Sequence, residues 1–400
     1  MTTKINNEHK KLNVPNLRFP EFQGEWKEHY LSDYLDFKNG LNPKPDKFGK
    51  GIKFISVMDI LNNAIITNDC IRASVDVSEE ELQNFCVENG DMLFQRSSET
   101  LEDVGRANVY MDDKPAVFGG FVIRGKKKAE YNPLFFRYLL ASPFARKKII
   151  PMGAGAQHFN IGQEGLNRVR LHFASLDEQK KIAKILSLLD ERIATQNKII
   201  EDLKKLKCAI IEKLYAEVKG TKYFYRQLFN IINERNKQLE YSNVLSASQE
   251  KGMVSREDLN LDIQFERSNI NTYKIVRNGD YVIHLRSFQG GFAFSEKTGV
   301  CSPAYTILRP NGLLEYGYLS YYFTSREFIQ SLIIVTYGIR DGRSINVDEW
   351  LDMKVVIPSK EQQTHIVNVI DSIENKIKNE EKYSNCLLNQ KQYLLRQMFI

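Results

Sequence analysis

Histidine, cysteine and acidic residues are scattered along this sequence without the spacing that a catalytic or metal site needs. The histidines, at positions 9, 29, 158, 172, 284 and 365, show no metal-ligand spacing. The five cysteines never form a Cys-x-x-Cys pair, which disfavours both a zinc site and disulfides and favours a reducing compartment. Pro45-Asp46 has no Glu-x-Lys partner of the kind that nuclease centres use. We therefore expect no metal centre on this chain.

Two further motifs resemble parts of active sites. Gly153-Ala-Gly-Ala156 is too short for a phosphate-binding loop and lacks the Gly-Lys-Ser/Thr that would have to follow. Tyr131-Asn-Pro-Leu-Phe135 resembles the Asn-Pro-Pro-aromatic motif that holds a base in adenine methyltransferases. However, Leu replaces the second proline and no glycine-rich cofactor turn precedes it. We interpret it as part of a core and expect no catalytic residues and no cofactor site.

The composition is that of an ordinary folded protein, with 42% hydrophobic and 26% charged residues over a length that allows two or three domains. The sequence contains no apolar run of the roughly 18–20 residues that span a bilayer, and its N-terminus has no apolar signal region. We expect a cytoplasmic protein. The net charge of +6 permits nucleic-acid binding without requiring it.

A heptad pattern occurs twice in the chain, with an offset of 184 residues. In the first copy the seam positions are Ile182, Leu186, Leu189, Ile193, Gln196, Ile200, Leu203, Lys207, Ile210 and Leu214. In the second they are Ile366, Ile370, Ile373, Ile377, Glu380, Ser384, Leu387, Lys391, Leu394 and Met398. Because both copies place polar residues at the same two positions, Gln196/Glu380 and Lys207/Lys391, chance agreement is improbable. Polar seam residues lower stability but fix the register of a coiled coil.

The repeat extends upstream of the helices. Each helix is preceded by a Ser-x-x-Glu/Gln capping box, at Ser175 and Ser359, and by an alternating strand-like stretch. Further upstream, Asn89-Gly-Asp corresponds to Asn278-Gly-Asp, each a turn before a β-rich run. The chain therefore contains two copies of one unit, a globular domain followed by a long helix.

This organisation predicts an α+β protein with a pseudo-two-fold internal repeat. Two similar mixed α/β target-recognition domains would be separated by two long antiparallel helices that form an intramolecular coiled coil. The expected boundaries are 1–174 for the first domain, 175–217 for the first spacer helix, 218–358 for the second domain and 359–400 for the second spacer helix. A helix of this length measures about 60 Å, which suits a spacer between two domains that read DNA.

The order of domain, helix, domain, helix resembles the specificity subunit of type I restriction-modification systems over nearly the whole chain. The resemblance rests on the opening VPNLRFPEFQGEWKEHYL, the Asn-Gly-Asp turns, the Asn160-Ile161 and Asn346-Val347 ends of the polar loops, and DEQKKIAKILSLLD with its second copy EQQTHIVNVIDSIENKI. It implies a non-catalytic subunit that reads a bipartite, asymmetric double-stranded DNA target, one half-site per domain.

The resemblance also implies partners. The helices would dock two methyltransferase subunits, which bind S-adenosylmethionine and methylate adenine. Restriction motor-nuclease subunits, which use ATP and Mg, would cut unmethylated DNA. Two alternatives from other classes are a standalone adenine methyltransferase or nuclease, and a tandem-repeat scaffold that binds only proteins.

Polar loops that recur in both copies are the candidate DNA contacts, because Arg, Lys, Asn and Gln bind phosphates and base edges. In the first domain they are Asn39, Lys44, Lys47, Lys50, Lys53, Gln95, Arg96, Ser97, Ser98, Gln157, His158 and Asn160. In the second domain they are Arg235, Asn236, Lys237, Ser246, Ser248, Gln249, Lys251, His284, Arg286, Ser287, Gln289, Arg340, Arg343, Ser344 and Asn346. The aspartates of the Asn-Gly-Asp turns are excluded, since they would repel phosphate.

Overall fold

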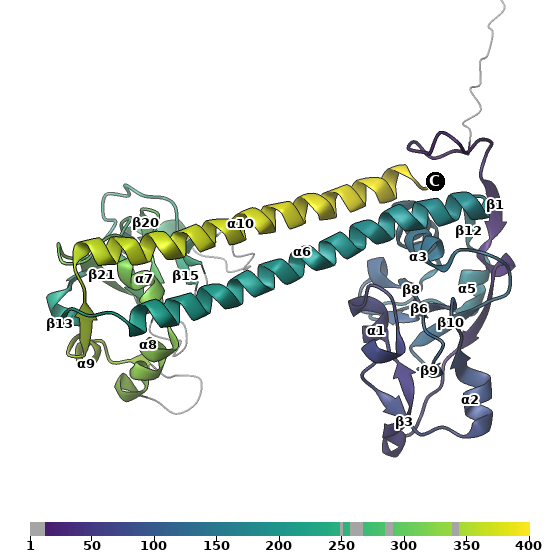
Figure 1. The fold of residues 1–400 in the computed structure, drawn as a ribbon, viewed down its shortest axis with the longest axis horizontal. Helices are drawn as coiled ribbons and strands as arrows, with labels where there is room; N and C mark the ends of the chain where they lie inside the picture. The colour runs from purple at the N-terminus through teal and green to yellow at the C-terminus, as the bar shows by residue number, and fades with distance from the viewer. Residues whose placement is uncertain (1–12, 249–250, 257–266, 285–290, 338–343) are drawn as a thin grey trace, which may run out of the picture. The chain divides into compact units, whose positions relative to one another are not determined.

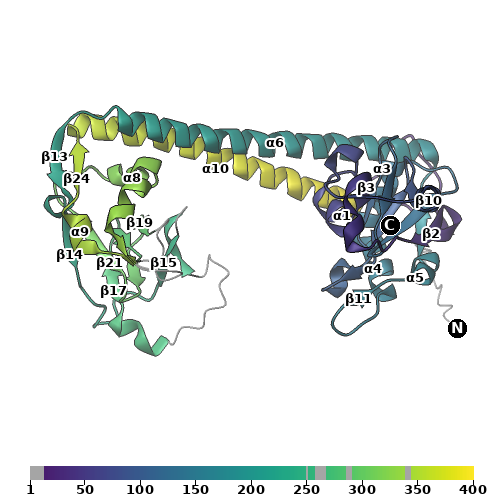
Figure 2. The ribbon, with the colours of Figure 1, turned by 90° about the horizontal axis from the view of Figure 1, so that it is seen from below.

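The computed structural model describes residues 13–248, 251–256, 267–284, 291–337 and 344–400. It divides into two compact units, one of residues 1–197 with 382–400 and the other of residues 198–381. Each unit combines one globular domain with parts of both long helices (Figures 1 and 2). Within the described ranges, no helix is both long and apolar enough to cross a membrane.

The first unit is built around a four-stranded antiparallel sheet and a second, mixed sheet. The first sheet has the order β2 (Leu35–Asn39), β10 (Val122–Lys127), β6 (Met92–Gln95) and β8 (Ala107–Val109). The second has the order β4 (Ser74–Val75), β3 (Phe48–Ile55), β9 (Ala116–Phe118) and β5 (Cys86–Val87), with β3 and β9 parallel. Two short pairs join β1 (Lys27–Tyr30) to β12 (Arg170–Phe173) and β7 (Ser97–Ser98) to β11 (Phe159–Asn160).

Five short helices accompany these strands: α1 (Val57–Asn62), α2 (Glu79–Phe85), α3 (Pro133–Ala141), α4 (Pro143–Ile149) and α5 (Gln163–Asn167). Helix α3 begins where the Asn132 side chain accepts a hydrogen bond from the Phe135 amide, with Pro133 at the first position. Its aromatic residues are buried in the domain core, and so is Tyr131, whose hydroxyl donates to the Gly90 carbonyl at 2.8 Å. The interpretation of Tyr131–Phe135 as core is confirmed.

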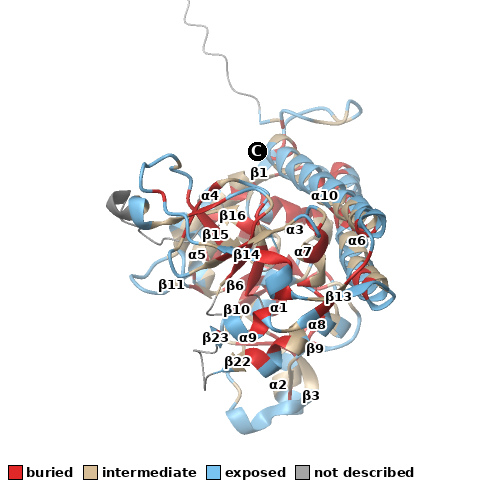
Figure 3. Ribbon diagram, turned by 90° about the vertical axis from the view of Figure 1, so that its left-hand side faces the viewer, coloured by how far each residue is buried: buried red, intermediate tan, exposed pale blue. Residues whose placement is uncertain are grey.

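The second unit repeats the main sheet in the same order. Strands β14 (Phe229–Ile232), β21 (Thr306–Pro310), β18 (Tyr281–Ile283) and β19 (Phe292–Phe294) correspond to β2, β10, β6 and β8. The remaining strands form the pairs β13 (Thr221–Phe224) with β24 (Lys354–Ile357), β15 (Leu245–Ser248) with β16 (Gly252–Ser255), β17 (Lys274–Val276) with β20 (Gly299–Cys301), and β22 (Thr336–Tyr337) with β23 (Ser344–Ile345). Strands β6 and β18 are buried throughout, whereas β2, β14 and β21 also contain intermediate or exposed residues (Figure 3 colours the chain by burial).

Three short helices, α7 (Tyr318–Tyr322), α8 (Arg326–Ser331) and α9 (Val347–Leu351), complete the second domain. The repeat extends to individual contacts. Ser142 caps α4 and Ser325 caps α8, and both are buried. Gly90 and Gly279 have positive φ values of 94° and 92°, as the turn requires. The buried Asp91 and Asp280 accept hydrogen bonds within their own turns, so their assignment as turn residues is confirmed.

The two long helices are α6 (Leu176–Ala216, 41 residues) and α10 (Lys360–Gln397, 38 residues). Ser175 and Ser359 accept hydrogen bonds from the amides of Glu178 and Gln362, as the capping pattern predicts. The Glu178 carboxylate is buried against Arg18, at 2.8 Å from both Nε and Nη2. The N-terminal segment thus packs on the first turn of α6.

A buried glutamine follows each capping box and was not identified from the sequence. Gln179 donates to the Ala174 carbonyl at 2.9 Å and accepts from the Asn132 amide at 2.9 Å. Gln363 does the same with Pro358 at 3.0 Å and Glu315 at 2.8 Å. Each glutamine joins the start of a long helix to the segment before α3 or α7, at equivalent positions in the two copies.

Helices α6 and α10 run antiparallel and lie side by side in both ribbon views (Figures 1 and 2). In the first unit, Leu189 and Ile193 pack against Leu387. Asp190 pairs with Lys391 at 2.5 Å. In the second unit, Lys207 pairs with Glu374 at 2.8 Å. Since 374 and 391 lie 184 residues after 190 and 207, these two ion pairs are equivalent under the internal repeat.

The seam residues differ in their burial. Those buried are Ile182, Leu186, Leu189, Ile193, Gln196, Ile366, Ile370, Ile377, Ser384, Leu387 and Met398. Those of intermediate burial are Ile200, Leu203, Lys207, Ile210, Leu214, Ile373, Glu380, Lys391 and Leu394. The strict heptad seam is wrong at the helix ends. Ile182 and Leu186 pack into the first domain's core, and Ile366 and Ile370 into the second's.

At the C-terminal ends of the helices, three buried residues lie outside the predicted seam, Ile211, Tyr215 and Phe399, while the seam residue Met398 is buried as predicted. Ile211 and Tyr215 are buried where Ile210 and Leu214 were predicted, because a straight helix drifts relative to a 3.5-residue repeat. Tyr215 packs on Tyr318 and Tyr322 of the second domain. Phe399, its equivalent in the second copy, packs on Trp26 and Phe135 of the first.

Candidate nucleic-acid interface

In the first domain the structure brings together two of the predicted loops. Strand β7 pairs with β11, so that Ser97 lies opposite Asn160 and the Ser97 hydroxyl donates to the Asn160 side chain. The backbone of Arg96 joins two neighbours, because its amide donates to Phe121 at 2.9 Å and its carbonyl accepts from Ile161 at 2.9 Å. Polar side chains from residues 63 positions apart therefore share one backbone-supported surface.

The members of this surface differ in accessibility. Gln157, His158 and Asn160 are exposed, and Arg96 and Ser97 are half-buried. Gln95 and Ser98 are buried, and the Gln95 amide donates to the Ser97 carbonyl at 2.9 Å. Gln95 and Ser98 thus support the loop from below, which leaves the other five as the part of this set that a ligand can reach.

The lysine-rich segment from Lys44 to Lys53 is only partly free to bind an anion. Lys47 and Lys50 pair with Asp76 at 3.7 and 3.3 Å. The hydrogen bond and charge of Lys50 lower the pKa of the Asp76 carboxyl. Lys53 donates to the Ile71 carbonyl at 2.7 Å, which gives it a structural role. Lys44 is exposed, and Asn39 is half-buried at the end of β2.

In the second domain, Arg235 and Lys237 are exposed, whereas Asn236 between them is 1% exposed. The Asn236 amide donates to the Tyr241 carbonyl at 2.8 Å, and its oxygen accepts from the Tyr241 amide. The structure therefore contradicts Asn236 as a DNA contact. A short Asn-rich loop signals such a turn as readily as a binding site, which the sequence alone could not resolve.

The β15–β16 hairpin carries the next set. Ser246 is buried and accepts a hydrogen bond from Arg256 Nε at 3.3 Å. Ser248 is half-buried, and Lys251 is exposed.

At β23, Ser344 is exposed, while Asn346 caps α9 by accepting from the Glu349 amide at 3.3 Å. Ser246 and Asn346 thus have structural roles. Six predicted contacts lie outside the described residues: Gln249, Arg286, Ser287, Gln289, Arg340 and Arg343.

His284 lies at the boundary of the described region and is half-buried, with its ring 5.1 Å from that of Tyr305. Burial raises the pKa of the Tyr305 hydroxyl. By strand register, His284 occupies the position of Gln95 in the first domain, since Ile283 and Phe94 end equivalent strands. The two domains therefore place different polar side chains at the same point of the fold.

One basic residue near the first surface is structural. Arg146 of α4 donates to the carbonyls of Glu102 and Val104 at 2.8 and 2.6 Å, and so fixes the loop that follows Ser98. Burial, reinforced by the nearby charge of Arg106, lowers the pKa of Arg146 to about 10. Arg146 was not predicted, because its role depends on the loop packing above it.

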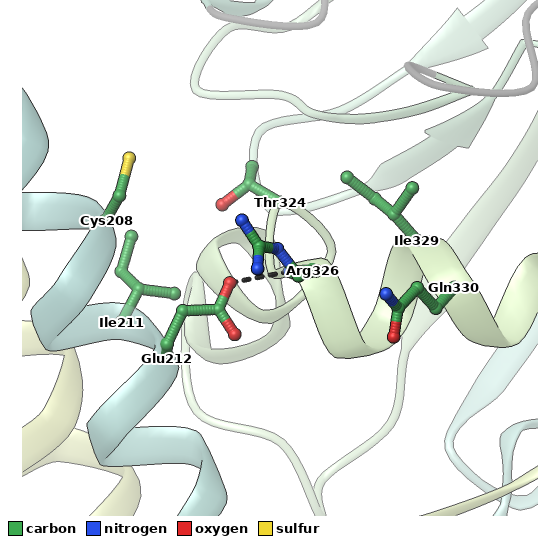
Figure 4. A pocket seen from close by; sticks show the side chains of 7 residues that line it. All are labelled: Cys208, Ile211, Glu212, Thr324, Arg326, Ile329 and Gln330. Carbon is green, nitrogen blue, oxygen red and sulfur yellow. Dashed lines mark hydrogen bonds between the residues drawn. The ribbon is translucent and has the colours of Figure 1, made fainter.

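A pocket of about 260 Å³ lies within the second unit, between α6 and α8 (Figure 4). Its lining consists of Cys208, Ile211, Glu212, Thr324, Arg326, Ile329 and Gln330. The Glu212 carboxylate accepts from the Arg326 amide at 2.6 Å and thereby holds α8 on α6. The lining does not place a nucleophile beside a base. The described residues likewise contain no cluster of histidine, cysteine or acidic side chains that could hold a metal ion.

Part of the chain is similar in sequence to known specificity subunits. Residues 23–205 match the family model of the type I restriction modification DNA specificity domain. A region of 214 residues is 28% identical to the MjaX specificity subunit of Methanocaldococcus jannaschii and covers 52% of this chain and 50% of that one. A region of 172 residues is 24% identical to the EcoKI specificity subunit of Escherichia coli K12 and covers 42% of this chain and 36% of that one. The alignments thus span about half or less of these relatives.

Solved structures extend the likeness to the whole fold. The type I specificity subunit from M. genitalium superimposes on this chain with a TM-score of 0.54 at 14% sequence identity. The match covers 97% of this chain and 99% of the M. genitalium chain. A chain from a structure of complex assembly and conformational transition of a type I system has a TM-score of 0.59, also at 14% identity, with coverages of 94% and 97%. Residues 23–205 therefore match the DNA specificity domain of type I restriction-modification systems, and the chain shares its fold with solved specificity subunits of that class.

Proposed function

We propose that this chain is a non-catalytic subunit that reads a bipartite, asymmetric DNA sequence, with one half-site per globular domain. The observation that carries the proposal is the duplicated domain on an antiparallel helix pair, in which equivalent strands present different loop residues. Arg96, Ser97 and Asn160 at the β7–β11 pair, with Gln157 and His158, are the first domain's candidate contacts. Lys44 would contribute a phosphate contact.

The second half-site would be read from exposed residues of the loop between β14 and β15, the β15–β16 hairpin and the β22–β23 pair. Among the described residues these are Arg235, Lys237, Lys251 and Ser344. Because the two sets share the fold but not the side chains, the half-sites should be unrelated in sequence. Lysine and arginine contacts to phosphate make such binding strongly dependent on salt.

The outer faces of α6 and α10 are proposed to dock two methyltransferase subunits. These subunits would bring S-adenosylmethionine and methylate adenine, and restriction subunits with ATP and Mg would cut unmethylated DNA in the cytoplasm. Exposed apolar residues on the two helices, among them Leu188, Leu206, Leu388 and Tyr393, support a protein interface there. On this proposal the chain itself holds no cofactor.

Co-expression with methyltransferase subunits, followed by genome-wide mapping of methylated adenines, tests the function. The expected result is one bipartite, asymmetric motif with a fixed spacer, which disappears when this chain is omitted. Methyl transfer or DNA cleavage by the purified chain alone would show an enzyme instead. A complex with its partners that binds no DNA at low salt would show a scaffold for proteins only.

A further inference from the structure

Phe121 presents an exposed aromatic ring at the tip of a rigid turn in the first domain. Its side chain is 68% exposed, although both Phe118 and Val122 beside it are fully buried. The turn between β9 and β10 is closed by a hydrogen bond from the Val122 amide to the Gly119 carbonyl at 2.8 Å. Because the Phe121 carbonyl also accepts from the Arg96 amide, the exposed ring is attached to the sheet at a fixed point.

Hydrogen-bonding side chains surround this turn. The Arg96 guanidinium donates to the Gly120 carbonyl at 3.3 Å. The Asn42 amide lies so close to Gly120 that a Cβ at position 120 would overlap Asn42 Oδ1. Gly120 is therefore required for Asn42 to approach the turn. One apolar ring thus lies beside groups that can bind base edges. Its backbone is bonded to Arg96, which precedes Ser97 of the Ser97–Asn160 pair.

We propose that Phe121 is a specificity-determining residue that reads a thymine of the first half-site by contact with its 5-methyl group in the major groove. This inference rests on the proposed function. Phenylalanine offers no hydrogen bond to a base, but the thymine methyl is the one apolar group that distinguishes a base in the major groove. Arg96 and Asn42 would bind neighbouring base edges or phosphates and hold the ring at groove depth.

The second domain differs at the equivalent place. Ile123 pairs with Phe94 in the first domain, and Thr306 pairs with Ile283 in the second. Two residues before Thr306 stands Ala304, which is also exposed. Since both domains expose this position but fill it with side chains of very different size, it can discriminate between half-sites. The contact proposed for Phe121 concerns the first half-site.

Deoxyuridine scanning of the methylation target tests the assignment. The intact chain, assembled with its methyltransferase subunits, would be assayed on duplexes in which each thymine of both half-sites is replaced in turn by deoxyuridine, which lacks only the methyl group. For the wild-type complex, one replacement in the first half-site should lower kcat/KM about four-fold, the effect expected for one buried methyl group. Phe121→Ala should lower kcat/KM on the unmodified target by at least that factor and should abolish the response to that one replacement.

Met58→Ala is the matched control, because Met58 of α1 is 61% exposed in the same domain. It should leave the uridine profile unchanged, and all variants should keep the profile of the second half-site. Thermal unfolding should show that Phe121→Ala folds normally, since its ring is largely exposed. If the wild-type complex methylates its target but Phe121→Ala has the same uridine profile, or if the first half-site has no sensitive thymine, the assignment is wrong. If the wild-type complex does not methylate any motif, the proposed function itself has failed.

Discussion

Asp190 of α6 connects the first domain to the helix pair, and neutralising it should destabilise the protein more than neutralising its counterpart Glu374. Asp190 accepts from the Tyr138 hydroxyl at 2.8 Å, from Arg137 at 3.3 Å and from Lys391 at 2.5 Å. Glu374 pairs with Lys207 at 2.8 Å. The internal repeat therefore supplies a matched pair of variants, Asp190→Asn and Glu374→Gln.

The expected magnitudes follow from burial. The side chains of Asp190, Arg137 and Lys391 are 17%, 16% and 23% exposed. Removing the carboxylate would leave two cations close together in this partly desolvated site, which should lower the free energy of unfolding by about 2–3 kcal/mol. The Lys207 and Glu374 side chains are 25% and 28% exposed. Loss of this single pair should cost about 1 kcal/mol or less.

Urea denaturation and calorimetry of the intact chain would measure the difference. For a unit of this size, about 2–3 kcal/mol corresponds to a fall in Tm of roughly 4–12 °C, against about 2–4 °C for Glu374→Gln. A second variant, Tyr138→Phe, should reproduce only the small part due to the hydroxyl. Equal losses in the free energy of unfolding for Asp190→Asn and Glu374→Gln would show that the contacts of Asp190 with α3 and α10 add no stability beyond that of a single ion pair.

The repeat and its contacts lead to four further expectations. Residues 1–217 alone should form a dimer in which Lys207 of each copy pairs with Asp190 of the other. A methyltransferase complex built on that dimer should methylate a symmetric target. Methylation at an asymmetric site would contradict the pseudo-two-fold organisation. Replacing Gln196 and Glu380 with Leu should raise Tm but disturb the half-site spacing, and an unchanged spacer in the methylation map would reject the register role. Gln179→Ala and Gln363→Ala should each lower the free energy of unfolding by about 1–3 kcal/mol, since each leaves buried backbone groups unpaired, and clearly unequal values in denaturant titrations would show that the two copies differ at this point. Asp76→Asn should strengthen DNA binding by the complex at low salt, because it releases Lys47 and Lys50, and unchanged affinity in a salt titration would show that these lysines do not reach phosphate.

The duplicated fold could be predicted from the sequence because both copies carry the same heptads, capping serines and Asn-Gly-Asp turns. The ends of the seam could not, since the choice between Ile210 and Ile211 depends on where a straight helix meets each domain. The pairing of Lys391 with Asp190 and of Lys207 with Glu374 could not be predicted either. It depends on the antiparallel direction of the two helices and on their register.

For the candidate interface, residue type alone could not separate Asn160, which is exposed, from Asn236, which is buried in its own turn. Both occur in polar loops. Phe121 was missed because a single phenylalanine after two glycines reads as core. Its exposure follows from the turn geometry, which depends on how β9 passes into β10.

Each globular domain is completed by the C-terminal end of the helix that follows the other domain in sequence. Met398 and Phe399 belong to the first domain's core, and Ile211 and Tyr215 to the second's. On the ribosome, the first domain is synthesised long before Met398 and Phe399 leave the exit tunnel. Trp26 and Phe135 therefore lack their contact with Phe399 until the whole second domain has been translated. Apolar surface that stays exposed during synthesis favours binding of chaperones to the nascent first domain.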